Sequence, residues 1–176
     1  MCLSSCVRAA VLALASAFVC GCACSGGKKT ENKPVPADFP YCRIPSVVAD
    51  ADRNDYYAAN YWKNFLSIEC SDVADTSFIG GVSKEQVEQA VANYASFLSS
   101  LDLGKAQSYF SNLASDLDAY AASHSASCLP LAFSDVLDRY FYDANSPVRD
   151  EDVYGAFAAR MASCSFVPES KRQTYA

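Results

Sequence analysis

Apolar residues recur with helical spacing through most of this chain, and this periodicity is the feature that most limits its fold. Between residues 106 and 124 they return at alternating steps of four and three, as in a helix packed within a bundle. The series is Ala106, Phe110, Leu113, Leu117, Tyr120 and His124. A half-buried strand would need apolar residues at every second position. The segment therefore predicts a long helix.

Four more segments show the same period. Aromatic residues recur at steps of four in residues 51–68, and an S-x-x-Q capping box opens the segment 83–101. A shorter helix is predicted for 133–142 after Pro130, and another begins after Asp150, a residue suited to an N-cap. Two segments resemble strands, near 77–82 and 165–167, but they are too short to predict a sheet. We predict an all-α fold, an antiparallel bundle or array of about five helices.

The first 21 residues have the layout of an exported leader. Arg8 precedes an apolar run from Ala9 to Val19, which is too short to span a bilayer. Cysteines then follow at positions 20, 22 and 24. Because the chain has one histidine and no matching ligand spacing elsewhere, no metal site is predicted there.

These cysteines fit the processing pattern of a bacterial lipoprotein better. Cys22 has Gly21 before it and the aliphatic Val19 three positions back, so we predict lipidation at Cys22, with Cys24 as the runner-up. The acyl chains would anchor the exported protein to the surface of a cell-envelope membrane. The polar, Pro-containing residues 22–38 read as a tether. The predicted organisation is a signal peptide in 1–21, this tether, and a helical domain in 39–176.

The charge and the motifs exclude several function classes. A net charge of −6 disfavours nucleic acid as a partner. The chain has no C-x-x-C pair, nucleophile elbow or phosphate-binding loop, and Asp116 and Asp118 are spaced so that they do not share one helix face. His124 is interpreted as a packed or helix-end residue. No catalytic residue, cofactor or metal is predicted for this chain alone.

Four cysteines remain in the predicted domain. An oxidising compartment would allow them to form two disulfides in any of three pairings, and buried free thiols are the alternative. The four are Cys42, Cys70, Cys128 and Cys164.

Two aromatic stretches resemble a known family. They are residues 53–65 (RNDYYAANYWKNF) and 140–154 (YFYDANSPVRDEDVY). With the prolines that follow Phe39 and Ile44, they resemble the helical N-terminal domain of Bacteroidetes lipoproteins in domain of unknown function family 5106. The matching residues are Tyr61 and Trp62 on the first helix and Tyr142, Asp143, Asn145, Ser146, Pro147 and Arg149 in a turn. The resemblance implies a following thioredoxin-like domain with its own C-x-x-C, which is absent from this sequence.

The residues themselves favour a structural role for both stretches. Asn145 and Ser146 suit a side-chain-supported turn, and Arg149 is expected to pair with an acid such as Asp143. Trp62 and its tyrosine neighbours are expected to fill the core. The alternative is an aromatic binding surface for a peptide or glycan, made by Tyr57, Tyr61 and Trp62.

Two functions remain after these exclusions. The first is a cell-envelope lipoprotein with a non-catalytic helical module that binds a partner or presents a substrate; the partner would be a peptide, a glycan or an envelope protein. The second is the N-terminal accessory part of a lipid-anchored thioredoxin-like thiol-disulfide oxidoreductase, whose catalytic domain would follow residue 176.

Overall fold

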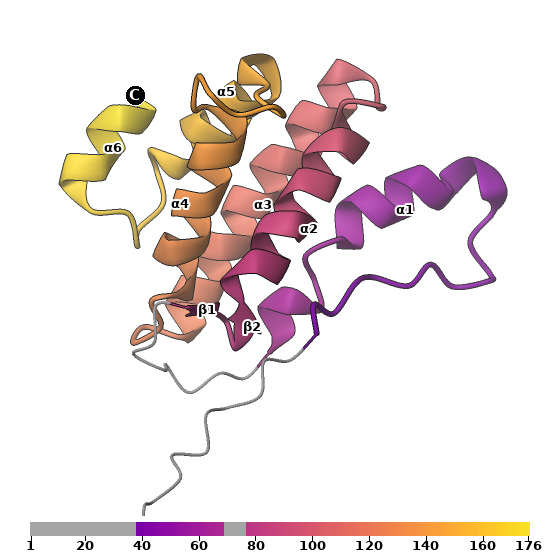
Figure 1. Cartoon of the computed structure of the whole chain (residues 1–176), viewed down its shortest axis with the longest axis horizontal. Coiled ribbons are helices and arrows are strands. Elements are labelled where there is room, and N and C mark those ends of the chain that lie inside the picture. Colours follow the sequence, from indigo (N-terminus) through magenta and orange to yellow (C-terminus); the bar gives the residue numbers. More distant parts are fainter. Residues whose placement is uncertain (1–37, 69–76) are drawn as a thin grey trace, which may run out of the picture. The chain divides into compact units, whose positions relative to one another are not determined.

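The structure is a computed structural model that describes residues 38–68 and 77–176, which belong to one unit. This part of the chain is an array of six α-helices with one small hairpin, so the all-α prediction is confirmed (Figure 1). The helices are α1 (Arg53–Asn60), α2 (Lys84–Leu98), α3 (Leu103–Ser123), α4 (Leu129–Phe141), α5 (Glu151–Met161) and α6 (Glu169–Tyr175). The hairpin pairs β1 (Phe78–Ile79) with β2 (Val82–Ser83), and two 3-10 helices, η1 (Asp50–Asp52) and η2 (Phe65–Ser67), flank α1.

The core lies where α3 packs along α5 and where α4 packs against α2 and α3. Phe110 of α3 is its centre: its ring stacks on Phe157 of α5 at 4.5 Å and lies 4.3 Å from the ring of Phe141 of α4. All three side chains are fully buried. Each such burial contributes about 2 kcal/mol. None of the helices in the described ranges is long and apolar enough to cross a membrane.

Three helices begin at side-chain caps. Asp102 accepts from the backbone of α3, and Asp150 accepts from Val153 N at the start of α5, as its residue type predicts. Ser83 accepts from Gln86 N at 3.4 Å, which forms half of the predicted capping box. The Gln86 side chain does not return to Ser83, because its Oε1 accepts from Phe39 N at 2.6 Å. This bond fixes the start of the described chain on α2.

The sequence prediction was wrong about several boundaries. The continuous helix predicted in 51–68 is interrupted after Asn60 by a turn, and only η2 resumes it. Pro130 does not precede the fourth helix; it lies in the first turn of α4, where no backbone N–H is required. The short helix α6 was not predicted at all. Its residues are mostly polar, so no apolar period marks it.

The hairpin depends on two glycines. Gly80 and Gly81 both have positive φ, 59° and 76°, which a two-residue turn between antiparallel strands requires. A Cβ on Gly80 would also lie 2.6 Å from Leu129 Cδ1. The turn therefore allows the hairpin to approach the first residue of α4.

Asp138 of α4 joins α6 to the rest of the domain. Its carboxylate accepts from the hydroxyls of Tyr154 on α5 at 2.9 Å and Tyr175 on α6 at 2.8 Å. Lys171 of α6 forms an ion pair with the same carboxylate at 3.0 Å. Burial and the neighbouring Asp138 raise the pKa of both tyrosines, which stay neutral donors. The sixth helix is thus held by polar contacts that its sequence pattern does not reveal.

Candidate functional site

The residues after α1 alternate between the core and the surface, and this alternation forms one wall of a cleft. Tyr61, Trp62 and Phe65 are buried, with exposed fractions of 4% or less. Lys63 and Ser67, which lie between or beside them, are exposed. The Asn60 side chain donates to Tyr56 O at 2.8 Å at the last residue of α1, where the helix gives way to the turn. The buried aromatic residues thus hold the turn in place while Lys63 projects outward.

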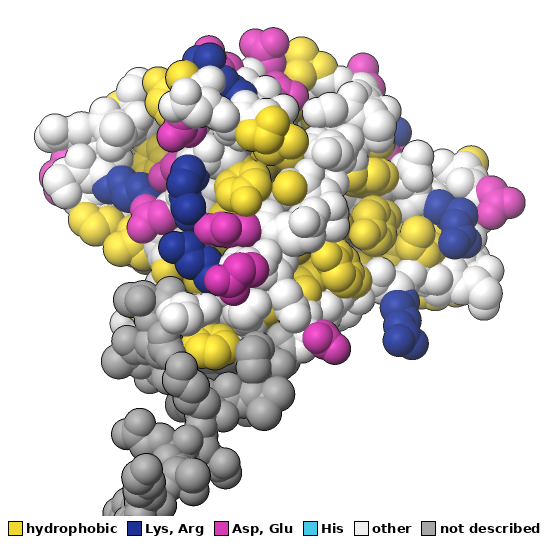
Figure 2. Space-filling model, viewed as in Figure 1, with side chains coloured by type: hydrophobic (Ala, Val, Ile, Leu, Met, Phe, Trp, Pro, Cys, Tyr) yellow, Lys and Arg dark blue, Asp and Glu magenta, His cyan; other side chains and the backbone are white. Residues whose placement is uncertain are grey.

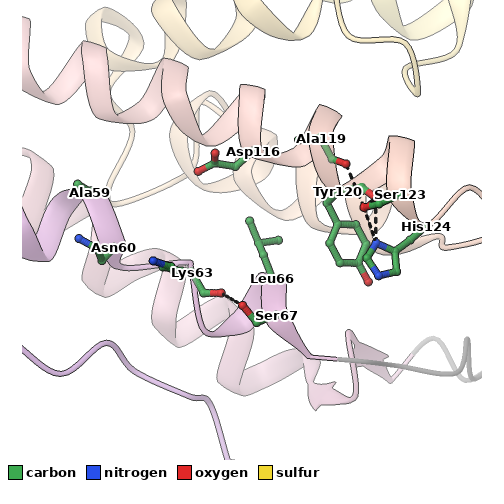
Figure 3. Close-up of a pocket in the computed structure, with 10 residues that line it drawn as sticks. All are labelled: Ala59, Asn60, Lys63, Leu66, Ser67, Asp116, Ala119, Tyr120, Ser123 and His124. Atoms are coloured by element: carbon green, nitrogen blue, oxygen red, sulfur yellow. Dashed lines mark hydrogen bonds between the residues drawn. The ribbon is translucent and has the colours of Figure 1, made fainter.

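The opposite wall is the C-terminal half of α3. Between the two walls lies an open cleft of about 490 Å³, which we call the α1–α3 cleft (Figure 3). Asp116 and Tyr120 come from α3, and Leu66 faces them from η2. The α1–α3 cleft is lined by Ala59, Asn60, Lys63, Leu66, Ser67, Asp116, Ala119, Tyr120, Ser123 and His124. The lining combines apolar walls with a few polar groups, as in small-ligand sites.

Two opposite charges face this cleft without neutralising each other. Asp116 and Lys63 both line it, yet neither side chain forms an ion pair within the described part of the chain. The surrounding protein removes part of the hydration of the Asp116 carboxylate, and this desolvation raises its pKa. A cationic group in the cleft would compensate for the lost hydration.

A smaller cavity of about 60 Å³ adjoins the cleft, which we call the inner cavity. It shares Ala59, Lys63 and Asp116 with the cleft, and the Trp62 ring lines it as well. The Trp62 Nε1 donor is buried and has no hydrogen-bond partner among the described residues. A buried donor of this kind costs about 1–3 kcal/mol until an acceptor reaches it.

Ser123 and His124 lie side by side in the cleft, but their geometry is not that of a catalytic pair. His124 Nδ1 lies 3.0 Å from Ser123 Oγ and 3.1 Å from Tyr120 O. The contact with Tyr120 O is a hydrogen bond only in the tautomer whose Nδ1 carries the hydrogen, and that tautomer is not a base for Ser123. The Ser123 hydroxyl already donates to the backbone of its own helix. The His124 ring stacks on Tyr120 at 4.1 Å. His124 ends α3 as its C-cap, which agrees with the helix-end interpretation.

The predicted aromatic binding surface is not exposed in the structure. Tyr61 and Trp62 are buried in the core, so the surface interpretation was wrong for these two, while Tyr57 is partly buried. The Tyr61 hydroxyl donates to Ala90 O at 2.9 Å, which is the polar partner expected for a core tyrosine. Trp62 contributes to the inner cavity from within the core.

The turn of residues 142–149, which carries part of the family resemblance, joins α4 to α5 and lies outside the cleft lining. The Ser146 hydroxyl donates to Tyr140 O, and Asp143 Oδ1 accepts from Asn145 N at 2.8 Å. Arg149 pairs with an acid as expected, but that acid is Glu151 and not Asp143. The exposed Tyr142 stacks on Tyr154 at 5.1 Å, and Pro147 lies in the same turn.

The cysteine predictions are tested only in part. No disulfide joins any two of Cys42, Cys128 and Cys164, the cysteines within the described ranges. Cys70 and the predicted lipidation residues Cys22 and Cys24 lie outside those ranges. Cys164 is fully buried, and burial raises the pKa of its thiol.

Sequence reasoning missed the two charges that define the cleft. The spacing of Asp116 and Asp118 excludes an acid and base pair on one helix face, and no other motif in the sequence includes Asp116. Asp116 borders the buried stripe of α3, three residues after Leu113 and four before Tyr120, but its own side chain is exposed. Neither Asp116 nor Lys63 has a sequence pattern that distinguishes it from an ordinary surface charge.

Comparisons with known proteins give a family and a fold. The family model described as Domain of unknown function (DUF5106) matches residues 22–175. The chain is also similar to the crystal structure of a thioredoxin-like protein from Bacteroides caccae, with a TM-score of 0.57 and 23% sequence identity. That similarity covers 78% of this chain and 45% of the other, so the chain spans less than half of that protein. No curated protein matches the chain. At this identity the likeness shows the fold alone.

Proposed function

Since the chain belongs to the family Domain of unknown function (DUF5106), we propose that it is a non-catalytic ligand-binding module of an exported lipoprotein, which holds its ligand in the α1–α3 cleft. The observation that most supports this function is the unneutralised pair of charges, Asp116 and Lys63, on the lining of one cavity. Both side chains are exposed to solvent, so a charged ligand in the cleft can reach each of them. The cavity volume of about 490 Å³ suits a small ligand.

The sequence supports the anchor that would place this module on the envelope. The leader, the lipidation pattern at Cys22 and the polar tether agree with one another. The family match also begins at residue 22. The lipid would hold the protein on a membrane surface, and the tether would separate the cleft from the lipid head groups.

The intact mass of the native protein from the cell envelope tests the anchor. The proposal expects the mass of a chain that begins at Cys22 with a diacylglyceryl group and a further acyl chain attached. A mature chain without lipid would contradict the anchor. A chain lipidated at Cys24 would support the anchor and shift its position by two residues.

Retention of a ligand in the cleft tests the binding function. The full chain would be equilibrated with the small-molecule fraction of an envelope extract, and the retained compounds would be identified by mass spectrometry. The matched control is Ala119→Trp, which fills the cleft from an exposed position on α3. We expect a compound retained by the natural sequence and lost from the control. Equal retention, or none, would contradict ligand binding in this cleft.

A second function has one observation in its favour, the likeness to a thioredoxin-like protein of more than twice the aligned length. In this alternative the helical module is the accessory part of a lipid-anchored thiol-disulfide oxidoreductase and presents substrates to its catalytic domain. Coding sequence that continues in frame after Ala176 to a strand and a C-x-x-C would support it. A native mass that ends at Ala176 would contradict it.

A further inference from the structure

The sign of the charged side chains changes along the cleft. Beyond Asn60 and Lys63 the cleft adjoins a second hollow of about 300 Å³, which we call the side hollow. The side hollow is lined by Arg43 as well as Lys63, so this end is basic. Asp116 lies on α3, on the lining of the cleft and the inner cavity but not of the side hollow. Lys63 lines all three hollows, so a ligand that extends from the inner cavity to the side hollow meets the anionic Asp116 first, then Lys63, and finally Arg43.

The buried donor of Trp62 adds a third requirement. Its Nε1–H needs an acceptor, and the inner cavity of about 60 Å³ has room for one carbonyl oxygen beside Asp116. The complementary ligand thus has a cationic donor and a neutral acceptor near each other, and an anion at its opposite end. An amino-terminal residue has the first two features, because its ammonium group and its carbonyl oxygen are separated by a single Cα.

We propose that the α1–α3 cleft binds a short peptide with free ends, whose ammonium group pairs with Asp116 and whose carboxylate pairs with Lys63 and Arg43. This inference rests on the proposed function and names its ligand class. A neutral glycan fits less well, since hydroxyl groups would leave both charges without a counter-charge. Charge-assisted hydrogen bonds are about twice as strong as neutral ones, so a zwitterionic ligand gains from both ends.

Tri-alanine and its blocked forms test the inference directly. The probes are tri-alanine with free ends, N-acetyl-tri-alanine, tri-alanine amide and the neutral sugar maltotriose. Trp62 is the single tryptophan of the chain, so its fluorescence reports on the inner cavity, and calorimetry provides the affinity. We expect each blocked form to bind at least about tenfold more weakly than tri-alanine, which corresponds to about 1.4 kcal/mol per lost charge contact.

Substitutions of the charged residues assign each end of the peptide. Asp116→Asn should weaken tri-alanine about tenfold and remove the preference over the N-acetyl form. Lys63→Met should reduce the preference over the amide, and the remainder should disappear when Arg43→Met is added. The matched control is Asp118→Asn, because Asp118 lies on the same helix but bonds to Ser165 outside the cleft. It should bind tri-alanine as the natural sequence does. Thermal unfolding of each variant would show that all of them are folded.

The outcomes separate this inference from the function on which it rests. Equal binding of free and blocked tri-alanine, no binding of tri-alanine, or tighter binding of maltotriose would overturn the zwitterionic peptide. A compound retained from the extract and lost in Ala119→Trp would still uphold a ligand site in each case. Equal retention by Ala119→Trp would instead contradict the proposed function itself.

Discussion

Two aspartates in neighbouring helices of the same array are held in opposite ways. Asp138 of α4 accepts from Tyr154 and Tyr175 and pairs with Lys171, so its carboxylate is surrounded by donors. Asp116 of α3 has no hydrogen-bond or ion-pair partner among the described residues. The difference separates a carboxylate that stabilises the fold from one that remains open to a ligand.

The surroundings of the two residues follow the same division. Figure 2 shows basic and acidic side chains lying next to one another over α4. Arg139 of that helix pairs with Glu88 of α2 at 3.1 Å, and Lys171 also contacts Asp135. In the α1–α3 cleft, by contrast, Lys63 and Asp116 form no ion pair with each other or with any other described residue. The polar groups of α4 thus hold α6 in place, whereas those of the cleft remain available to a ligand.

The largest change in stability should come from removing the Asp138 carboxylate, the one of the two that is surrounded by donors. Asp138→Ala would leave the partly buried hydroxyls of Tyr154 and Tyr175 without their acceptor and would unpair Lys171. We expect a loss of about 3 kcal/mol in the free energy of unfolding, because each abandoned donor costs about 1–3 kcal/mol and the ion pair is only partly exposed. Urea unfolding measures this loss.

Asp135→Ala is the matched control for that substitution. Asp135 contacts the same Lys171, but its side chain is 63% exposed. We expect a change within about 0.5 kcal/mol. Equal losses in the two variants would mean that Asp138 has no special role in docking α6.

A smaller effect should come from the aromatic core behind the cleft. Tyr61 and Trp62 are adjacent and both buried, but only Tyr61 has a partner for its donor, Ala90 O. Tyr61→Phe should lower the free energy of unfolding by about 1 kcal/mol, since a satisfied buried hydrogen bond is lost. Tyr57→Phe is the control, because Tyr57 is only partly buried. A neutral Tyr61→Phe would show that the bond adds nothing to stability.

Sequence reasoning located the helices well because each depends on local signals. Asp150 and Ser83 cap their helices as predicted, and the stripe from Ala106 to Tyr120 is buried in α3. Failures arose where tertiary contacts decided the outcome. The Gln86 side chain accepts from Phe39 N and does not complete its capping box, and the helix predicted in 51–68 gives way to a turn after Asn60.

The candidate site was less predictable than the fold. Catalytic pairs have recognisable spacings in a sequence, whereas this site consists of two exposed charges that form no ion pair in the described ranges and one buried donor without an acceptor. Whether a polar side chain finds a partner here depends on how α1, η2 and α3 pack together. Residue spacing alone does not specify that packing. Trp62 was correctly expected in the core, but its buried donor without an acceptor emerged only from the structure.

Asp116→Asn should change stability little and in the opposite direction to Asp138→Ala. The desolvated carboxylate has a pKa above its ordinary value of 3.8, so its ionised form is disfavoured in the folded state. Stability therefore falls as the pH rises through that raised pKa. The variant should be more stable than the natural sequence at neutral pH by up to about 0.5 kcal/mol, and the difference should vanish below about pH 4.

Urea unfolding at several pH values measures that difference. The other charged and titratable groups around Asp116 are Lys63 across the cleft, Tyr94 and Tyr109 at the inner cavity, and His124 at the end of α3. The comparison should therefore be repeated in a His124→Gln background. A variant that is less stable at neutral pH, with a difference that shrinks on acidification as the carboxylate of the natural sequence becomes protonated, would reverse the sign and assign Asp116 a structural role like that of Asp138.

The smallest expected effect concerns the thiol of Cys42 in the side hollow. Burial raises the pKa of Cys42, and the nearby charge of Lys63 lowers it in part. Lys63→Met should raise that pKa further and slow alkylation of Cys42 at pH 8 about twofold, because the thiolate is the reactive form. Mass spectrometry of the digested protein measures alkylation of Cys42 separately from that of the other cysteines. The buried Cys164 should stay unlabelled in both proteins. Faster alkylation in the variant would mean that Lys63 shields the thiol sterically, and that its charge does not act on the side hollow.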